Sequence, residues 1–198
     1  NAIAANTLLK TLEEPPGDAR FVLSCAAPDT LLPTIRSRCQ ALPLAAPPTE
    51  MALQWLAGKG VDRAEAMLRA TGGQPLEVLE WVEQGVDTEL WLRLPALVAR
   101  GEHSAFVGWP LPRLVDALQK LCHDALCSAV GAPPRYFPVA TLGRAAQAGA
   151  LLDWARALSL AAKQAEHPWS ADLMTESLIQ QGQRALAEGA ALRARPAV

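Results

Sequence analysis

The sequence lacks the features of a membrane, zinc or broad nucleic-acid-binding protein. Its longest apolar runs are a few residues long, far short of the roughly 20 that span a bilayer. Its four cysteines form no C-x-x-C pair, and its three histidines do not stand at ligand spacing from them. Eighteen basic residues against 20 acidic ones give a net charge of −2, which disfavours a phosphate-wrapping surface. No secretory signal is evident, so we expect reduced thiols in a cytoplasmic protein.

Motifs for common catalytic sites are missing as well. A phosphate loop requires G-x-x-x-x-G-K-[ST], whereas the one Gly-Lys pair, Gly58-Lys59, is followed by Gly60. The G-x-S-x-G motif of serine hydrolases is also absent. The adjacent carboxylates Glu13 and Glu14 diverge by about 100° on a helix, which is typical of a solvated helix end and not of a catalytic dyad. We expect no intrinsic catalysis.

What the sequence has is enough apolar residues for a core, 51% of 198. Residues 1–14 predict a helix that Pro15-Pro16 ends. Short apolar runs at 21–23 and 40–44 predict buried strands, with a short helix within 31–38 between them. Because the chain opens without methionine in helix-like sequence, we expect it to continue a longer polypeptide. Two strands beside short helices favour the end of an α/β domain, residues 1–45.

A Pro-rich linker at 45–48 precedes a region that has only helical patterns. Three short helices are expected within 46–86: the first capped by Thr49, the second capped by Asp62, and the third with Pro75 in its first turn. They form a small helical domain. The six tryptophans are scattered singly among apolar positions, which favours packing between helices over base stacking.

Longer amphipathic helices follow in residues 87–198. One carries an apolar stripe at i, i+4, i+7 and i+11, namely Leu114, Leu118, Leu121 and Ala125. A second carries a similar helical stripe at i, i+3, i+7 and i+11, namely Leu151, Trp154, Leu158 and Ala162. Pro95 predicts a break or kink, and Ser170 is expected to cap the last helix. The fold class is therefore mostly α, with three domains.

One segment is specific enough to indicate a family. Residues 4–16 read A-A-N-T-L-L-K-T-L-E-E-P-P, the apolar run 21–23 follows, and Ser37-Arg38-Cys39 comes later with Arg36 before it. In order and spacing this resembles the clamp-loader branch of the AAA+ ATPases. The resemblance implies the C-terminal part of an AAA+ domain in 1–45, a lid in 46–86 and a collar in 87–198.

The resemblance also implies a role for Arg38. In that family the arginine of Ser-Arg-Cys reaches across a subunit interface to the γ-phosphate of ATP held by a neighbour. A planar, permanently protonated guanidinium suits that task because it binds two phosphate oxygens at once. Ser37 and Cys39 are expected to pack and cap. Arg36 stays open between orienting the interface and facing water, and Glu13 and Glu14 belong to the motif.

The positions that would serve the chain's own nucleotide differ from those of ATP-hydrolysing relatives. Cys25 and Ala26 stand where a polar sensor 1 residue ends its strand, and Leu76 stands at the sensor 2 arginine position. The resemblance thus implies a non-hydrolysing subunit with no cofactor of its own. ATP-Mg would be held by neighbours, and zinc only by a segment before residue 1.

The implied partners are the gamma/tau and delta clamp-loader subunits in a hetero-pentamer. The implied role is in loading a sliding clamp onto primed DNA for the replicative DNA polymerase III holoenzyme. Two alternatives remain: an ATP-hydrolysing subunit of the same loader, and a non-replicative helical scaffold or adaptor.

Overall fold

The computed structural model describes residues 9–25, 29, 31–143, 146–164 and 171–191. The chain divides into two compact units, residues 1–45 and residues 46–198. The predictions for residues 1–8, Ala26 and the Ser170 cap lie outside the described residues. No helix among the described residues is long and apolar enough to cross a membrane.

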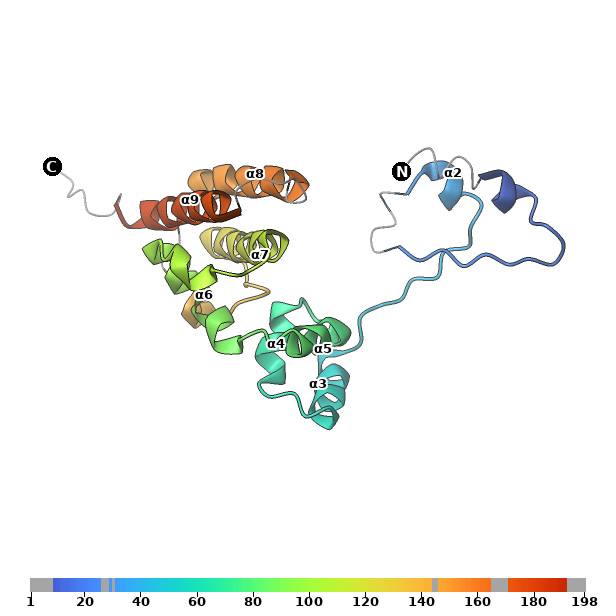
Figure 1. Ribbon diagram of the computed structural model, residues 1–198, viewed down its shortest axis with the longest axis horizontal. Coiled ribbons are helices and arrows are strands. Elements are labelled where there is room, and N and C mark those ends of the chain that lie inside the picture. Colours follow the sequence, from blue (N-terminus) through green and yellow to red (C-terminus); the bar gives the residue numbers. More distant parts are fainter. Residues whose placement is uncertain (1–8, 26–28, 30, 144–145, 165–170, 192–198) are drawn as a thin grey trace. The chain divides into compact units, whose positions relative to one another are not determined.

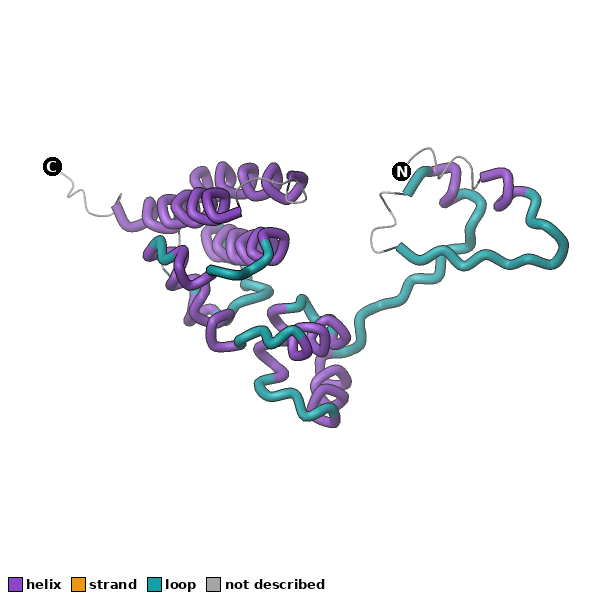
Figure 2. The backbone as a smooth tube through the Cα atoms, in the orientation of Figure 1, coloured by secondary structure: helices purple, strands orange, loops and turns teal. Residues whose placement is uncertain are grey.

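The first unit contains short helices joined by loops. Residues 9–13 are helical, and α2 spans Pro33–Arg36 with Pro33 at its start, as expected for a proline in a first turn. The two expected strands are wrong: within the described part of this unit, segments 21–23 and 40–44 are loop (Figure 2). Val22 is 96% exposed and Leu44 90% exposed. A strand requires a neighbouring strand to pair its backbone groups, and neither segment has one there.

Three short helices begin the second unit (Figure 1): α3 (Thr49–Gly58), α4 (Ala64–Ala70) and α5 (Pro75–Glu83). They enclose a small apolar core made by Ala52, Leu56, Met67, Leu68 and Val78. Pro75 occupies the first turn of α5, as predicted. The two expected caps are wrong, because Pro48 and Arg63 occupy the N-cap positions and Thr49 and Asp62 do not. We call α3–α5 the lid helices.

The longer helices of the second unit are α6 (Thr88–Arg100), α7 (Leu111–Ala129), α8 (Ala148–Gln164) and α9 (Ala171–Ala191). We call them the collar helices. They pack into one apolar core, with α7 against α8, α8 against α9, and α9 against α6 (Figure 1). The stripe predicted on α7 is confirmed, since Leu114, Leu118 and Leu121 are fully buried.

Two expectations are wrong, one for the collar helices and one for the lid helices. The break expected at Pro95 is absent, because α6 continues to Arg100 with the proline buried inside it. Trp55 does not pack in the core either: it is 39% exposed on α3, with the Lys59 ammonium over its ring. Trp91 and Trp154 are buried, in agreement with the packing interpretation.

Candidate functional site

The proposed interface arginine, Arg38, lies against Glu13 within the first unit. Its Nε donates to Glu13 Oε1 at 2.6 Å, and Nη2 forms an ion pair with the same carboxylate. Nη1 donates to the Thr34 carbonyl at 2.9 Å and lies 3.4 Å from Ser37 Oγ. The helix end that carries Glu13 and the turn that carries Arg38 are thus brought together, although 25 residues separate them.

This arrangement uses one edge of the guanidinium fork. An arginine offers five N–H groups in a fixed plane, and Glu13 takes the edge made by Nε and Nη2. A second bidentate partner would bind along the edge made by Nη1 and Nη2, where Thr34 already contacts Nη1. The Arg38 side chain is 36% exposed, so an anion from outside the unit can reach it.

The neighbouring residues of the motif differ in their surroundings. Ser37 is the C-cap residue of α2, and its hydroxyl donates to the Thr34 carbonyl at 3.1 Å. Arg36 pairs with Asp29 at 3.4 Å, and both side chains are more than half exposed. Cys39 is a free, exposed thiol, and Glu14 is exposed at the end of its helix. Arg38 is therefore the motif residue with the most contacts inside the unit.

The two residues that the family resemblance assigns to nucleotide sensors are exposed and carry no charge. Cys25 is an exposed free thiol, and Leu76, in the first turn of α5, is 67% exposed. Neither side chain offers a cation to a phosphate. The described residues contain no group of three or more His, Cys, Asp or Glu placed to hold a metal ion.

The structure reveals a buried carboxylate that the sequence analysis did not single out. Asp124 of α7 is fully buried and accepts hydrogen bonds from the backbone N–H groups of Arg135, Tyr136 and Phe137 at 2.7–2.8 Å. His123 Nδ1 lies 3.0 Å from the same carboxylate. Asp124 therefore fixes the loop that follows α7. An acidic residue in an otherwise apolar stripe was the available sequence signal.

A second buried polar group on α7 is Cys122. Its thiol donates to the Leu151 carbonyl at 3.3 Å and so joins α7 to α8. Burial raises the pKa of this thiol to about 12, because the low-dielectric surroundings disfavour the thiolate. Cys122 is therefore a packing residue and not a nucleophile.

Comparison with known proteins bears on the first unit most directly. Residues 1–48, which include both Glu13 and Arg38, match a family model described as DNA polymerase III, delta subunit. The chain is 35% identical over 135 residues to the DNA polymerase III subunit delta' of Escherichia coli, covering 59% of this chain and 40% of that protein. It is 45% identical over 92 residues to the delta' subunit of Pseudomonas aeruginosa, covering 43% of this chain and 27% of that protein.

A second type of subunit is also similar. The DNA polymerase III subunit gamma/tau of Mycobacterium bovis is 37% identical over 87 residues, which cover 40% of this chain and 15% of that protein. The chain thus spans at most two fifths of the length of these relatives. The resemblance to bacterial DNA polymerase III subunits, the delta' type among them, is confirmed over the matched residues.

Proposed function

We propose that this chain is part of a delta'-type clamp-loader subunit that acts in the cytoplasm during DNA replication. The observation that carries the proposal is Arg38, which stands in the Ser-Arg-Cys motif of the matched region and is held there by Glu13. The delta' identities of 35% and 45% support the subunit type.

In the proposed mechanism, Arg38 completes the ATP site of a neighbouring subunit. Negative charge is spread over the oxygens of the transferred phosphoryl group in the transition state, and a guanidinium can hold two of them at once. The Nη1–Nη2 edge is the edge we assign to that phosphate, since Glu13 takes the other. A lysine would supply charge without the planar fork.

We propose that the chain has no nucleotide of its own to hydrolyse. The sequence has no phosphate loop, and an exposed leucine stands at the sensor 2 position. ATP-Mg would belong to gamma/tau subunits, which with a delta subunit would complete a hetero-pentamer through the collar helices. The assembly would then open a sliding clamp and place it on primed DNA.

The similarity to gamma/tau subunits favours a second candidate, an ATP-hydrolysing subunit of the same loader. Leu76 and Cys25 oppose it, because neither side chain can stabilise phosphate charge. Titration calorimetry of the full-length subunit with ATP separates the two: the delta'-type role requires no binding at micromolar concentrations, and clear binding would favour the hydrolysing role.

The direct test is the steady-state ATPase of reconstituted loaders that contain Arg38→Ala. We expect the fold and assembly to be retained, because a partly exposed arginine adds little to stability. The clamp- and DNA-stimulated ATPase should fall, although by less than the roughly 10³–10⁵-fold known for such arginines, because one of several sites is affected.

Two further variants sharpen this test. Arg38→Lys should rescue little activity, since it lacks the fork. Arg36→Ala is the matched control, an exposed arginine of the same motif that pairs only with Asp29 among the described contacts, and it should reduce the ATPase less. Equal ATPase for Arg38→Ala and wild type would remove the proposed role.

A further inference from the structure

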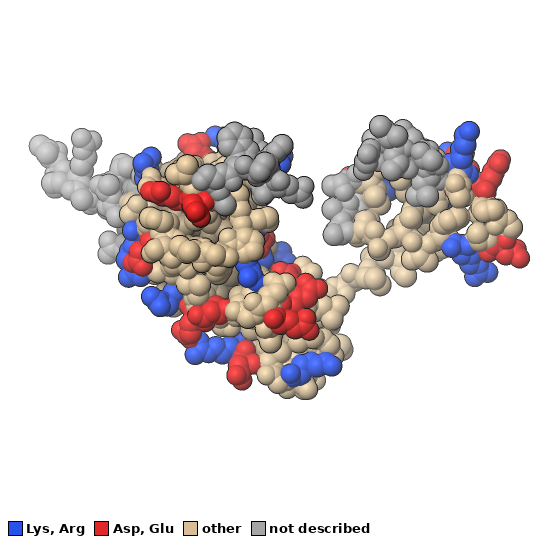
Figure 3. All heavy atoms as spheres, viewed as in Figure 1, with Lys and Arg blue, Asp and Glu red and all other residues tan. Residues whose placement is uncertain are grey.

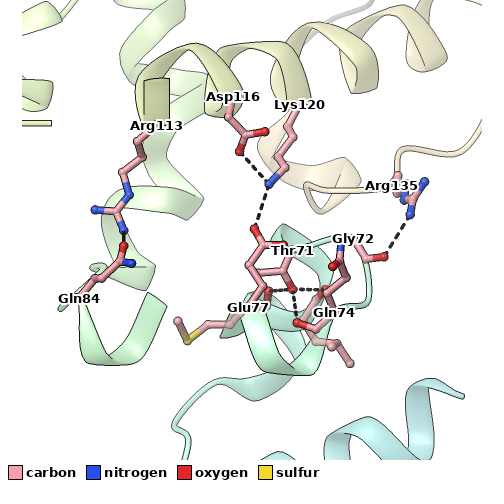
Figure 4. A network of polar contacts seen from close by, with 11 residues as sticks. Thr71, Gly72, Gln74, Glu77, Gln84, Arg113, Asp116, Lys120 and Arg135 are labelled. Carbon is pink, nitrogen blue, oxygen red and sulfur yellow. Dashed lines mark hydrogen bonds and ion pairs between the residues drawn. The ribbon is translucent and has the colours of Figure 1, made fainter. Parts of the chain in front are cut away.

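The lysine of α7, Lys120, lies where the lid helices meet the collar helices (Figure 4). Only 12% of its side chain is exposed, which is unusual for a lysine. Its ammonium lies 2.8 Å from Asp116, one turn earlier on α7, and 3.7 Å from Glu77 on α5. The lysine therefore contacts an acid of its own helix and an acid of the lid.

Three aromatic rings surround the same ammonium. The Lys120 Nζ is 5.2 Å from the ring centre of Trp81, 5.9 Å from Trp91 and 5.7 Å from Tyr136. These rings come from α5, from α6 and from the loop after α7. A cation within about 6 Å of an aromatic face is attracted by the ring's negative face, and more strongly when water is excluded. Lys120 is thus caged by rings from the lid and from the collar.

The rings of the cage pack against further aromatic rings at the contact between the lid helices and the collar helices, which we call the joint. Trp91 stacks on Phe137 with centres 4.7 Å apart, and Trp81 packs on Trp91 at 5.2 Å. Asp124, one turn after Lys120 on α7, holds the backbone of Tyr136 and Phe137. Two polar residues of α7 therefore position these rings: Lys120 contacts the ring faces, and Asp124 binds the backbone of Tyr136 and Phe137.

The peripheral contacts at the joint are more exposed. Arg135 donates to the Gly72 carbonyl at 3.1 Å, and Arg113 donates to Gln84 at 2.8 Å (Figure 4). Arg63, at the start of α4, forms an ion pair with Glu89 of α6. All three contacts are solvent-exposed, so each contributes little to stability. The buried part of the joint is the cage, together with Ala70 of α4, which lies in the collar core.

The lid and the collar have separate apolar cores that meet at two lid residues: Ala70 of α4 is buried in the collar core, and the partly buried Trp81 packs against both cores. Two bodies with their own cores move relative to one another by default unless the contact between them is large and apolar. The apolar contact at this joint is small, and Lys120 adds to it contacts with α5, with α6 and with the loop after α7.

We propose that Lys120, caged by Trp81, Trp91 and Tyr136, locks the lid helices at one angle on the collar helices. The lid helices and the collar helices then move as one rigid body. The attraction between the Lys120 ammonium and the rings is the main contribution to this lock, because the contact with Glu77 of the lid is long. Asp116 neutralises the ammonium but belongs to α7, so that contact does not hold the lid. This inference concerns the fold and does not depend on the proposed role of Arg38.

The test measures the distance between the lid and the collar in the full chain by double electron–electron resonance spectroscopy. Spin labels go on two exposed helix positions, Gln54→Cys on α3 and Ser159→Cys on α8. Cys122 is buried and stays, and the other cysteines are replaced by serine: Cys25, Cys39 and Cys127. The labelled parent should give one narrow distance distribution.

Lys120→Met keeps a chain of similar length and removes the charge. We expect its helical content to match the parent and its distance distribution to widen about twofold or more, as for two bodies joined by a flexible contact. Lys120→Arg, which keeps a cation over the rings, should stay narrow. Glu77→Gln should also stay narrow, because the cage remains.

Lys163→Met is the matched control, an exposed lysine of α8 that should change nothing. A distribution for Lys120→Met as narrow as that of the parent would overturn the proposal. Loss of helical content in Lys120→Met would also overturn it, because Lys120 would then hold the cores and not the joint between them.

Discussion

The Arg38 guanidinium donates from Nε to the Glu13 carboxylate across 2.6 Å, and Nη2 forms an ion pair with the same group. Glu13 ends one helix of the first unit, and Arg38 follows α2, so the pair connects two segments that lie 25 residues apart in the sequence. The pair orients the fork of Arg38, and that orientation matters for bidentate binding of phosphate.

Glu13→Gln is expected to lower the stimulated ATPase of a reconstituted loader, though by less than Arg38→Ala. The amide still accepts one hydrogen bond but no longer holds the guanidinium by charge. Stability should change by about 0–1 kcal/mol, because both side chains are more than a third exposed. The ATPase and the melting temperature are measured together.

Glu14→Gln, at the adjacent exposed acid, is the control and should leave the ATPase unchanged. If Glu13→Gln and Glu14→Gln behave alike, Glu13 does not position Arg38. If Glu13→Gln lowers the melting temperature strongly, the pair serves the fold of the unit instead.

The helices of the second unit were predictable because their apolar residues recur at helical spacing. The stripe of Leu114, Leu118 and Leu121 placed α7 and its buried face correctly. The prediction of strands at 21–23 and 40–44 was wrong, because an apolar run indicates that a segment can be buried but does not show which other strand would pair with it.

The Lys120 cage and the Glu13–Arg38 pair could not be predicted from the sequence for a related reason. The Lys120 cage draws on Trp81, Trp91 and Tyr136, from three separate segments, and nothing in local spacing brings them to one point. The motif drew attention to both Glu13 and Arg38, but not to their pairing. The sequence therefore indicated which residues belong to the site, but not which residues distant in the sequence contact one another.

Gly182→Ala is expected to destabilise the second unit by about 1–3 kcal/mol, through overpacking. A Cβ at Gly182 of α9 would lie 2.5 Å from the Trp154 ring and 2.8 Å from Val98 Cγ1. Both atoms belong to buried side chains that have little room to move. Urea unfolding followed by circular dichroism measures the change.

Gly149→Ala is the matched control, because a Cβ there meets nothing within 4 Å on α8. It should stabilise the chain slightly, by less than about 1 kcal/mol, because Gly149 lies in the first turn of α8 and the full propensity difference applies to a helix interior. Equal effects of the two substitutions would mean that α9 packs less closely on α6 and α8 than described.

Glu77→Gln is expected to stabilise the chain at pH 7 and to lose that advantage in acid. Burial raises the pKa of the Glu77 carboxyl above its usual 4.5, and Lys120 opposes the shift only in part. A raised folded-state pKa gives stability that is present below about 4.5 and lost as pH rises through the folded value. Glutamine, which stays neutral, keeps that stability at pH 7.

Melting temperatures of wild type and Glu77→Gln from pH 4 to 7.5 check this. The difference between them should grow as pH rises, and the other carboxylates cancel because both proteins carry them. A variant that is less stable than wild type at pH 7 would show that the pairing with Lys120 outweighs the burial of Glu77.

Asp124→Ala is expected to be the most damaging of these substitutions, at about 3 kcal/mol or more. Asp124 is fully buried and accepts three backbone N–H groups, and a hydrogen bond to a charged group contributes about 1.5–3 kcal/mol. Alanine leaves those donors without their acceptor beneath the loop. Asp124→Asn should cost less, because one oxygen remains, but its amide nitrogen would face a backbone N–H.

Urea unfolding measures the loss, and hydrogen exchange at the amides of Arg135, Tyr136 and Phe137 locates it. Asp153→Asn is the control, since that carboxylate is 77% exposed and pairs only with Arg156 three residues on. An Asp124→Asn variant no less stable than Asp153→Asn would contradict the role assigned to the buried carboxylate. Faster exchange confined to the three amides, with the α7 core still protected, is the expected pattern, because the acid ties the loop to a helix that folds without it.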